Sequence, residues 1–129
     1  MRLMAIDYGK KRVGIASTDE TGRFALPRMI LENDKTLLDK VLKFKKDEGI
    51  EKIVIGESRN LDNSANPIQA EISQFQTELE KHGVETVLHP EIFTTVEARR
   101  LQGKSKMIDA SAAALILKSF LDTMYNEGI

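Results

Sequence analysis

Four acidic residues that are distant in the sequence stand beside segments predicted to be buried strands or helices: Asp7, Glu57, Glu91 and Asp109. Apolar residues flank Asp7 on both sides, and a carboxylate in such a strand is costly unless a positive group compensates it. Carboxylates gathered at one place repel one another, and a bound cation relieves that repulsion. Oxygen ligands in a chain without cysteine favour Mg²⁺ or Mn²⁺ over zinc. The acids therefore predict a catalytic divalent metal site able to hydrolyse a phosphodiester.

Each of these acids also has a purely structural explanation. Asp7 could make a turn hydrogen bond at a strand end. Capping explains Asp109 as well as metal binding does, if spacing alone is considered. Glu57 and Glu91 could be exposed loop residues.

Basic and hydroxyl side chains could line a site of this kind. Lys10, Lys11 and Arg12 directly follow the segment of Asp7, and hydroxyls at a predicted helix N-terminus could hold a phosphate. The net charge of −1 gives no general attraction to nucleic acid, and a solvated face is the more common explanation of any one basic cluster. The predicted nucleic-acid contacts are Lys10, Lys11, Arg12, Thr94, Thr95, Arg99 and Lys106.

The length of 129 residues fits one domain, over 1–129. A hydrophobic content of 41% and a charged content of 30% are typical of globular proteins. No apolar run approaches the roughly 18 residues of a membrane span, and the first residues lack the apolar stretch of a signal peptide. We therefore expect a cytoplasmic location and no membrane partner.

Apolar patterns predict strands over 2–7, 12–18, 23–31, 52–56 and 84–89. Pro27 indicates that the third strand lies at an edge, and the bare apolar run Ile53–Ile55 indicates a strand buried on both faces. Capping residues and glycines predict helices from Asn33-Asp34 to Gly49, from Asn66 with Pro67 first to Gly83, from Thr94 to Gly103, and over 108–125.

This order predicts an α/β fold of the RNase H-like kind. A three-strand antiparallel meander and two parallel strands would form one five-stranded mixed sheet with helices on both faces. Sites in open α/β sheets form beyond the carboxyl ends of the strands. Asp7 and Glu57 would end neighbouring strands about 4.8 Å apart and could share a cation. Glu91 follows the fifth strand, and Asp109 opens the last helix.

An ordered set of short blocks resembles the YqgF family of RuvX-type, resolvase-like proteins. The blocks are Asp7-Tyr8-Gly9 with 11–16, then 53–56, then Glu91 with 94–98, and finally 108–110 with 112–113 and 116–117. The resemblance implies an RNase H-like nuclease acting on structured nucleic acid. Its substrate would be the 5′ end of pre-16S rRNA, in ribosome biogenesis, or a Holliday junction. Its metal-binding acids map to Asp7, Glu91 and Asp109, and its basic turn maps to Lys11 and Arg12.

The chain departs from the family pattern at two places. It has Pro90-Glu91-Ile92 where the family commonly has Asp-Glu-Arg, and Gly56-Glu57-Ser58 where the family commonly has Gly-Leu-Pro. Glu57 could therefore act in place of Glu91 or beside it. A non-catalytic nucleic-acid or ribosome-binding module with a degenerate site remains an alternative. A nucleotide phosphohydrolase of the actin–hexokinase type is another. The choices between RNA and DNA, and between monomer and homodimer, stay open.

Overall fold

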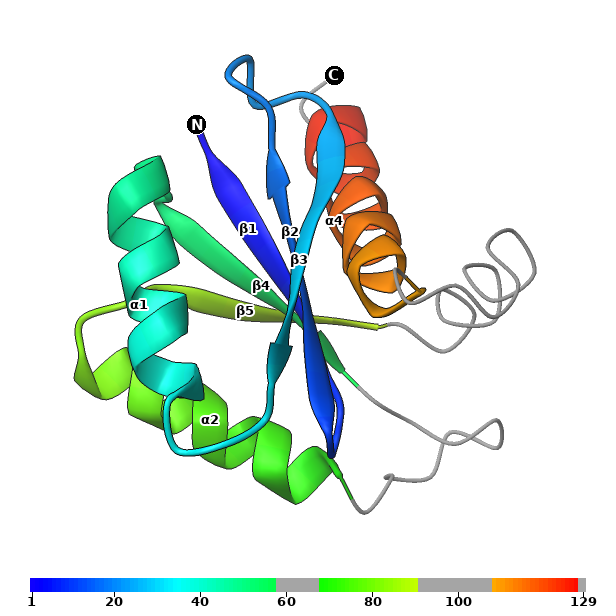
Figure 1. Cartoon of the computed structure of the whole chain (residues 1–129). Coiled ribbons are helices and arrows are strands. Elements are labelled where there is room, and N and C mark those ends of the chain that lie inside the picture. Colours follow the sequence, from blue (N-terminus) through cyan, green and yellow to red (C-terminus); the bar gives the residue numbers. More distant parts are fainter. Residues whose placement is uncertain (58–67, 91–107, 128–129) are drawn as a thin grey trace.

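Strand β1 lies at the centre of a five-stranded sheet whose order is β3-β2-β1-β4-β5 (Figure 1). The structure is a computed structural model that describes residues 1–57, 68–90 and 108–127, with side chains at 110–124 in the last range. β1 pairs antiparallel with β2 and parallel with β4, while β2 pairs antiparallel with β3 and β4 parallel with β5. The predicted mixed α/β sheet is confirmed. The strands are β1 (Leu3–Tyr8), β2 (Arg12–Thr18), β3 (Ala25–Glu32), β4 (Lys52–Glu57) and β5 (Thr86–Pro90).

Helices cover both faces of this sheet, as predicted. Helices α1 (Leu37–Glu48) and α2 (Gln69–Lys81) cover one face, and helix α4 (Ile108–Glu127) covers the other. Successive strand residues point to opposite faces. Met4 and Ile6 therefore belong to the core beneath α1 and α2, while Leu3 and Ala5 belong to the core beneath α4. Among the described helices, none is both long and apolar enough to cross a membrane.

The third strand lies at an edge of the sheet, as Pro27 predicted. Proline has no N–H to donate to a ladder, so an edge position or a bulge suits it. Here Ile15 pairs with Met29 and Ala16 pairs with Pro27, so the register shifts at Arg28. The shift lets the strand carry a proline and continue to pair with β2.

The prediction that the first helix begins at Asn33-Asp34 is wrong, because α1 begins at Leu37. The carboxylate of Asp34 accepts hydrogen bonds from the backbone N–H of Thr36, at 2.8 Å, and from its hydroxyl, at 2.6 Å. This local turn competes with helix formation over the same residues. The two bonds, the hydroxyl first, also lower the pKa of Asp34.

Other helix and strand ends differ from the predicted ones by a few residues or fall outside the described residues. β3 and β5 each begin two residues later than predicted, at Ala25 and Thr86. Gly49 ends α1 with a φ of 64°, the left-handed conformation that glycine adopts at little cost. The cap predicted at Asn66 and Pro67 and the helix predicted from Thr94 lie outside the described residues.

Candidate active site

Asp7 lies near the carboxyl end of the central strand, between two strands that carry glycine at its level. Gly14 of β2 is its register partner. On the other side Ile6 pairs with Ile55, and the same register continued by one residue brings Gly56 of β4 beside Asp7. Glycine has no side chain, so neither neighbouring strand fills the space next to this half-buried carboxylate. The two neighbouring strands therefore place no side chain directly beside Asp7.

The side chain of Asp7 belongs to the face that α4 covers, because Asp7 alternates with Leu3 and Ala5. Helix α4 runs back toward the end of the sheet where the chain begins, so its first turns lie away from that end (Figure 1). Asp109 is the second residue of α4, and its side chain lies outside the described residues. Asp7 therefore faces the side of the sheet that α4 covers, and Asp109 belongs to α4 itself.

Glu57 ends the strand next to Asp7, at the same edge of the sheet, as predicted. It alternates with Ile53 and Ile55, however, which belong to the core beneath α1 and α2. Alternation thus directs Glu57 toward the face opposite to that of Asp7. A metal-binding role for Glu57 stays a prediction, and the register favours other partners for Asp7.

The donor chemistry of Asp7 fits a hard divalent cation, since carboxylate oxygens are ligands that Mg²⁺ and Mn²⁺ accept. Among the described residues, no group of three or more His, Cys, Asp or Glu side chains could hold a metal ion. Glu91 and the side chain of Asp109 lie outside the described residues. A metal-binding role for Asp7 therefore stays a prediction, and a complete set of ligands would need these other acids.

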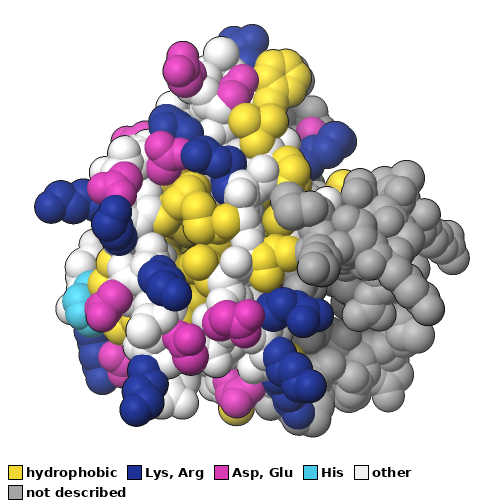
Figure 2. All heavy atoms as spheres, in the orientation of Figure 1, with side chains coloured by type: hydrophobic (Ala, Val, Ile, Leu, Met, Phe, Trp, Pro, Cys, Tyr) yellow, Lys and Arg dark blue, Asp and Glu magenta, His cyan; other side chains and the backbone are white. Residues whose placement is uncertain are grey.

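Three exposed basic residues follow Asp7: Lys10 and Lys11 in the turn between β1 and β2, and Arg12 at the start of β2. In the described part of the chain, Lys10 and Lys11 make no ion pair and donate no side-chain hydrogen bond. Figure 2 shows Lys and Arg side chains at the end of the molecule where this turn lies. The exposed ammonium groups of Lys10 and Lys11 could contact an anionic ligand such as a phosphate. The other predicted contacts, Thr94, Thr95, Arg99 and Lys106, lie outside the described residues, as does Glu91.

His89 of β5 lies on the same sheet face and in the same row as Asp7, with Gly56 between them. Its Nε2 is 2.8 Å from the hydroxyl of Ser119 in α4, and its ring meets Phe120 edge-on with 5.8 Å between centroids. Burial lowers its pKa, which favours the neutral ring. The sequence-based site did not include His89, whose alternation with Val87 was the available signal.

On the opposite face, a cavity of about 260 Å³ opens beside Tyr8. The Tyr8 ring packs against Phe75 at 5.5 Å, and Glu71, Gln74 and Glu78 complete the lining. Two carboxylates make this cavity unsuited to a phosphate.

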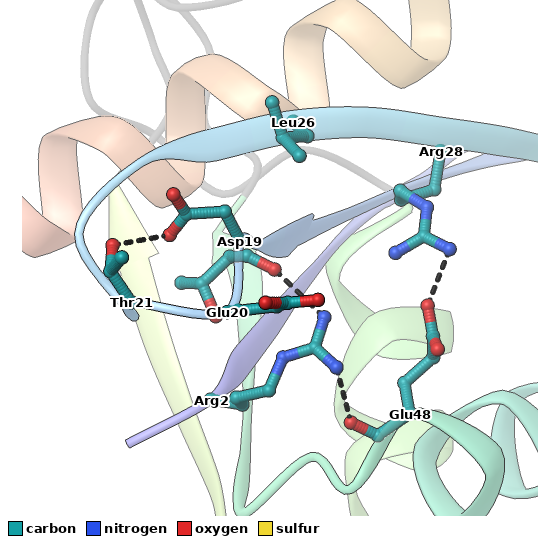
Figure 3. A pocket seen from close by; sticks show the side chains of 8 residues that line it. Arg2, Asp19, Glu20, Thr21, Leu26, Arg28 and Glu48 are labelled. Carbon is teal, nitrogen blue, oxygen red and sulfur yellow. Dashed lines mark hydrogen bonds and ion pairs between the residues drawn. The ribbon is translucent and has the colours of Figure 1, made fainter.

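A larger cavity, of about 490 Å³, lies at the other end of the sheet (Figure 3). Arg2 and Arg28 extend into this region, and their guanidinium groups contact protein oxygens. Arg2 donates to the carbonyl oxygens of Glu48, at 2.7 Å, and Thr18, at 2.9 Å, while Arg28 forms an ion pair with the Glu48 carboxylate. These arginines connect β1, β2, β3 and α1, and we interpret the contacts as structural.

The strand order, with an acid at the end of the central strand, is that of an RNase H-like fold. Solved structures agree at the level of the fold. The Thermus thermophilus RuvC structure in complex with a Holliday junction substrate superposes with a TM-score of 0.61 at 13% identity, covering 97% of this chain and 96% of that one. The Fowlpox virus resolvase, in complex with Holliday junction DNA, gives 0.61 at 12% identity over 96% and 99%.

The chain belongs to the RuvX family, described as Holliday junction resolvase, whose model matches residues 1–123. A relative from Anaplasma marginale is 33% identical over 99% of this chain and 88% of its own length. One from Streptococcus agalactiae is 34% identical over 97% of this chain and its entire length. Both are named, provisionally, as pre-16S rRNA nucleases. The predicted family and its nuclease or resolvase class are confirmed, and metal dependence stays a prediction.

Proposed function

We propose that this chain is a Mg²⁺- or Mn²⁺-dependent endonuclease that hydrolyses phosphodiester bonds near the 5′ end of pre-16S rRNA. The observation that carries the proposal is the position of Asp7 at the end of the central strand, between glycine-bearing strands, in an RNase H-like sheet. The names of the relatives support the RNA substrate, and the family description supports branched DNA as the alternative. The proposed reaction belongs to the cytoplasm, where ribosomal RNA is matured.

The residues divide into two groups by their proposed roles. Asp7, Asp109 and Glu91 would hold the metal, with Glu57 as the alternative to Glu91. When bound, a divalent cation lowers the pKa of an attacking water and neutralises the leaving oxygen. Lys10, Lys11 and Arg12 would bind the phosphates beside the cleaved bond. The acidic cavity at Tyr8 would repel the backbone and so keep it on the Asp7 side.

The first test replaces Asp7 by asparagine, which keeps the size of the side chain and removes its charge. Loss of residues that merely support metal ligands costs about 10- to 100-fold in activity or affinity, so loss of a ligand should cost more than about 100-fold. Cleavage would be measured on precursor RNA, four-way DNA junctions, duplex DNA and single-stranded DNA, each with Mg²⁺ or Mn²⁺. Preference for the precursor RNA would support the proposed substrate.

The matched control is Asp122→Asn, at an exposed position on α4 where the carboxylate pairs with Lys118 at 3.1 Å. This control should cleave like the original chain, because an exposed pair contributes little. Both variants should keep the circular dichroism spectrum of the folded protein. Full cleavage by Asp7→Asn with either metal would refute the proposal. Glu57→Gln and Glu91→Gln, compared in the same assay, would identify the third acid.

A binding module with an inactive site is the second candidate. Pro90 favours it, because this residue pairs with Glu57 at the end of β5 where the family commonly has an acid. This candidate predicts strong binding of junctions or precursor RNA without any metal-dependent product. Turnover that disappears in Asp7→Asn would exclude it.

Oligomeric state bears on the choice of substrate. A four-way junction has two-fold symmetry, so its resolution favours a two-fold dimer, whereas an RNA-processing enzyme can act as a monomer. Sedimentation of the protein with and without a junction would distinguish a dimer from a monomer. A stable dimer with a preference for junctions would replace the RNA substrate by branched DNA.

A further inference from the structure

Asn33 connects the segment after β3 to the basic turn, which lies well before it in the chain. Its side-chain Nδ2 donates to the carbonyl oxygen of Gly9 at 2.7 Å. Its backbone N–H donates to the carbonyl oxygen of Lys11 at 2.9 Å. We propose that Asn33 is a positioning residue that holds the turn of Lys10, Lys11 and Arg12 in the orientation that binds nucleic-acid phosphates. The inference rests on the proposed function.

The turn has physical reasons to need such support. Three like charges stand at consecutive exposed positions and repel one another. The ladder between β1 and β2 ends with the pair Tyr8 and Val13, so residues 9–11 form the turn beyond it, while Arg12 begins β2 and pairs with Glu32 of β3. A Cβ at Gly9 would lie 2.5 Å from the carbonyl oxygen of Arg12, which shows how tightly the backbone folds back. Contacts from outside the hairpin can therefore decide where the lysines point.

The chemistry of the contact explains why asparagine suits this position. The carbonyl oxygen of Gly9 needs a donor, and an amide supplies one while remaining uncharged. Aspartate has nearly the same shape but cannot donate when ionised. The backbone bond to Lys11 does not depend on the side chain, so replacing Asn33 removes only the bond to Gly9. The expected defect is a displaced or mobile turn in a folded protein.

The test is a double-mutant cycle on nucleic-acid affinity. Binding of a fluorescent four-way DNA junction and of a precursor-RNA stem would be measured without divalent metal, across a salt series. Asn33→Ala and Asn33→Asp should each raise Kd by about 3- to 10-fold, the range set by the loss of one hydrogen bond. The dependence of affinity on salt should become shallower, because the turn then neutralises fewer phosphates. In the Lys10→Ala/Lys11→Ala background, Asn33→Ala should cause a much smaller loss, because only Arg12 of the three basic residues remains.

A second measurement follows the turn without any nucleic acid. Backbone ¹⁵N relaxation should show increased motion at Lys10 and Lys11 in Asn33→Ala. The matched control is Thr123→Ala, which removes a side-chain bond to a backbone carbonyl, that of Ser119, at an exposed position on α4. It should change neither affinity nor the motion of the turn.

Two results would overturn the inference. One is an Asn33→Ala effect of equal size with and without the lysines, because the residue would then act elsewhere. The other is an unchanged turn together with unchanged affinity. Neither result contradicts the proposed function if the original chain still binds and cleaves nucleic acid. Conversely, absence of cleavage with intact binding would remove the nuclease proposal and leave the role of Asn33 standing.

Discussion

The two ends of the central strand use charge in opposite ways. Where β1 begins, Arg2 donates to two backbone carbonyls, and the Arg28 guanidinium pairs with Glu48 and stacks over the Phe44 ring at 5.2 Å (Figure 3). Where β1 ends, Asp7 stands between glycine-bearing strands, and Lys10 and Lys11 extend into solvent. The first end joins elements together, and the second presents charge to a ligand.

The charged residues at the first end stabilise the fold, whereas those at the second end are exposed to a ligand. Charged groups that satisfy one another stabilise a particular geometry but have little left for a substrate. Exposed like charges contribute little to folding and can bind an anion. Substitutions at the first end should therefore change folding, and substitutions at the second should change binding.

The largest effect on folding is expected from Arg2→Met at the first end. Hydrogen bonds from a charged donor contribute about 1.5–3 kcal/mol each, and two carbonyls would lose their partner, so we expect a loss of about 3–6 kcal/mol. Urea unfolding followed by circular dichroism would measure it. Cleavage per folded molecule should stay the same. Impaired cleavage at unchanged stability would break the distinction between the two ends.

A smaller effect, on binding alone, is expected from Lys10→Ala/Lys11→Ala at the second end. The free energy of unfolding should change by no more than about 0.5 kcal/mol, as at other exposed positions. Affinity for nucleic acid should fall, and the slope of log K against log salt should decrease by about 1 for each phosphate that the variant no longer neutralises. Titrations at several salt concentrations would check this. An unchanged slope would show that the turn does not bind phosphate.

The smallest effect concerns His89, which lies at the second end, in the same row as Asp7. Burial lowers its pKa in the folded state, so the unfolded chain takes up a proton first as pH falls below the usual value of 6.5. Stability should be complete above that pH and decrease below it. His89→Gln should flatten this decrease in urea titrations between pH 7 and pH 5. His82→Gln, at an exposed position, serves as the control and should leave the decrease unchanged.

Local patterns were enough to predict most of the sheet. Pro27 indicated the edge, and Ile53–Ile55 indicated a strand buried on both faces, because each signal depends on the residue's own backbone and burial. The predicted start of α1 was wrong because a local pattern can have two structural meanings. Asp34 is a good cap residue, but here its carboxylate bonds to Thr36 in a turn that precedes the helix. Composition alone could not distinguish these two uses.

The candidate site was only partly predictable. The importance of Asp7 followed from a charge inside an apolar run. The glycines beside it, the opposite face of Glu57 and the alignment of His89 all depend on strand register. The hydrogen bond between Asn33 and Gly9 joins residues 24 positions apart. Register and such long-range bonds arise from pairing between distant segments, which no local pattern specifies.

The sequence by itself determined the family, the order of elements and the acid at the end of the central strand. These depend on residue types and on patterns within a few positions, where propensity and alternation act. The tertiary structure decided which side chains share a face with Asp7, what space lies beside it and what holds the basic turn. Those features depend on how strands pair and helices pack, because a shift of one residue in register reverses the face of every side chain in a strand.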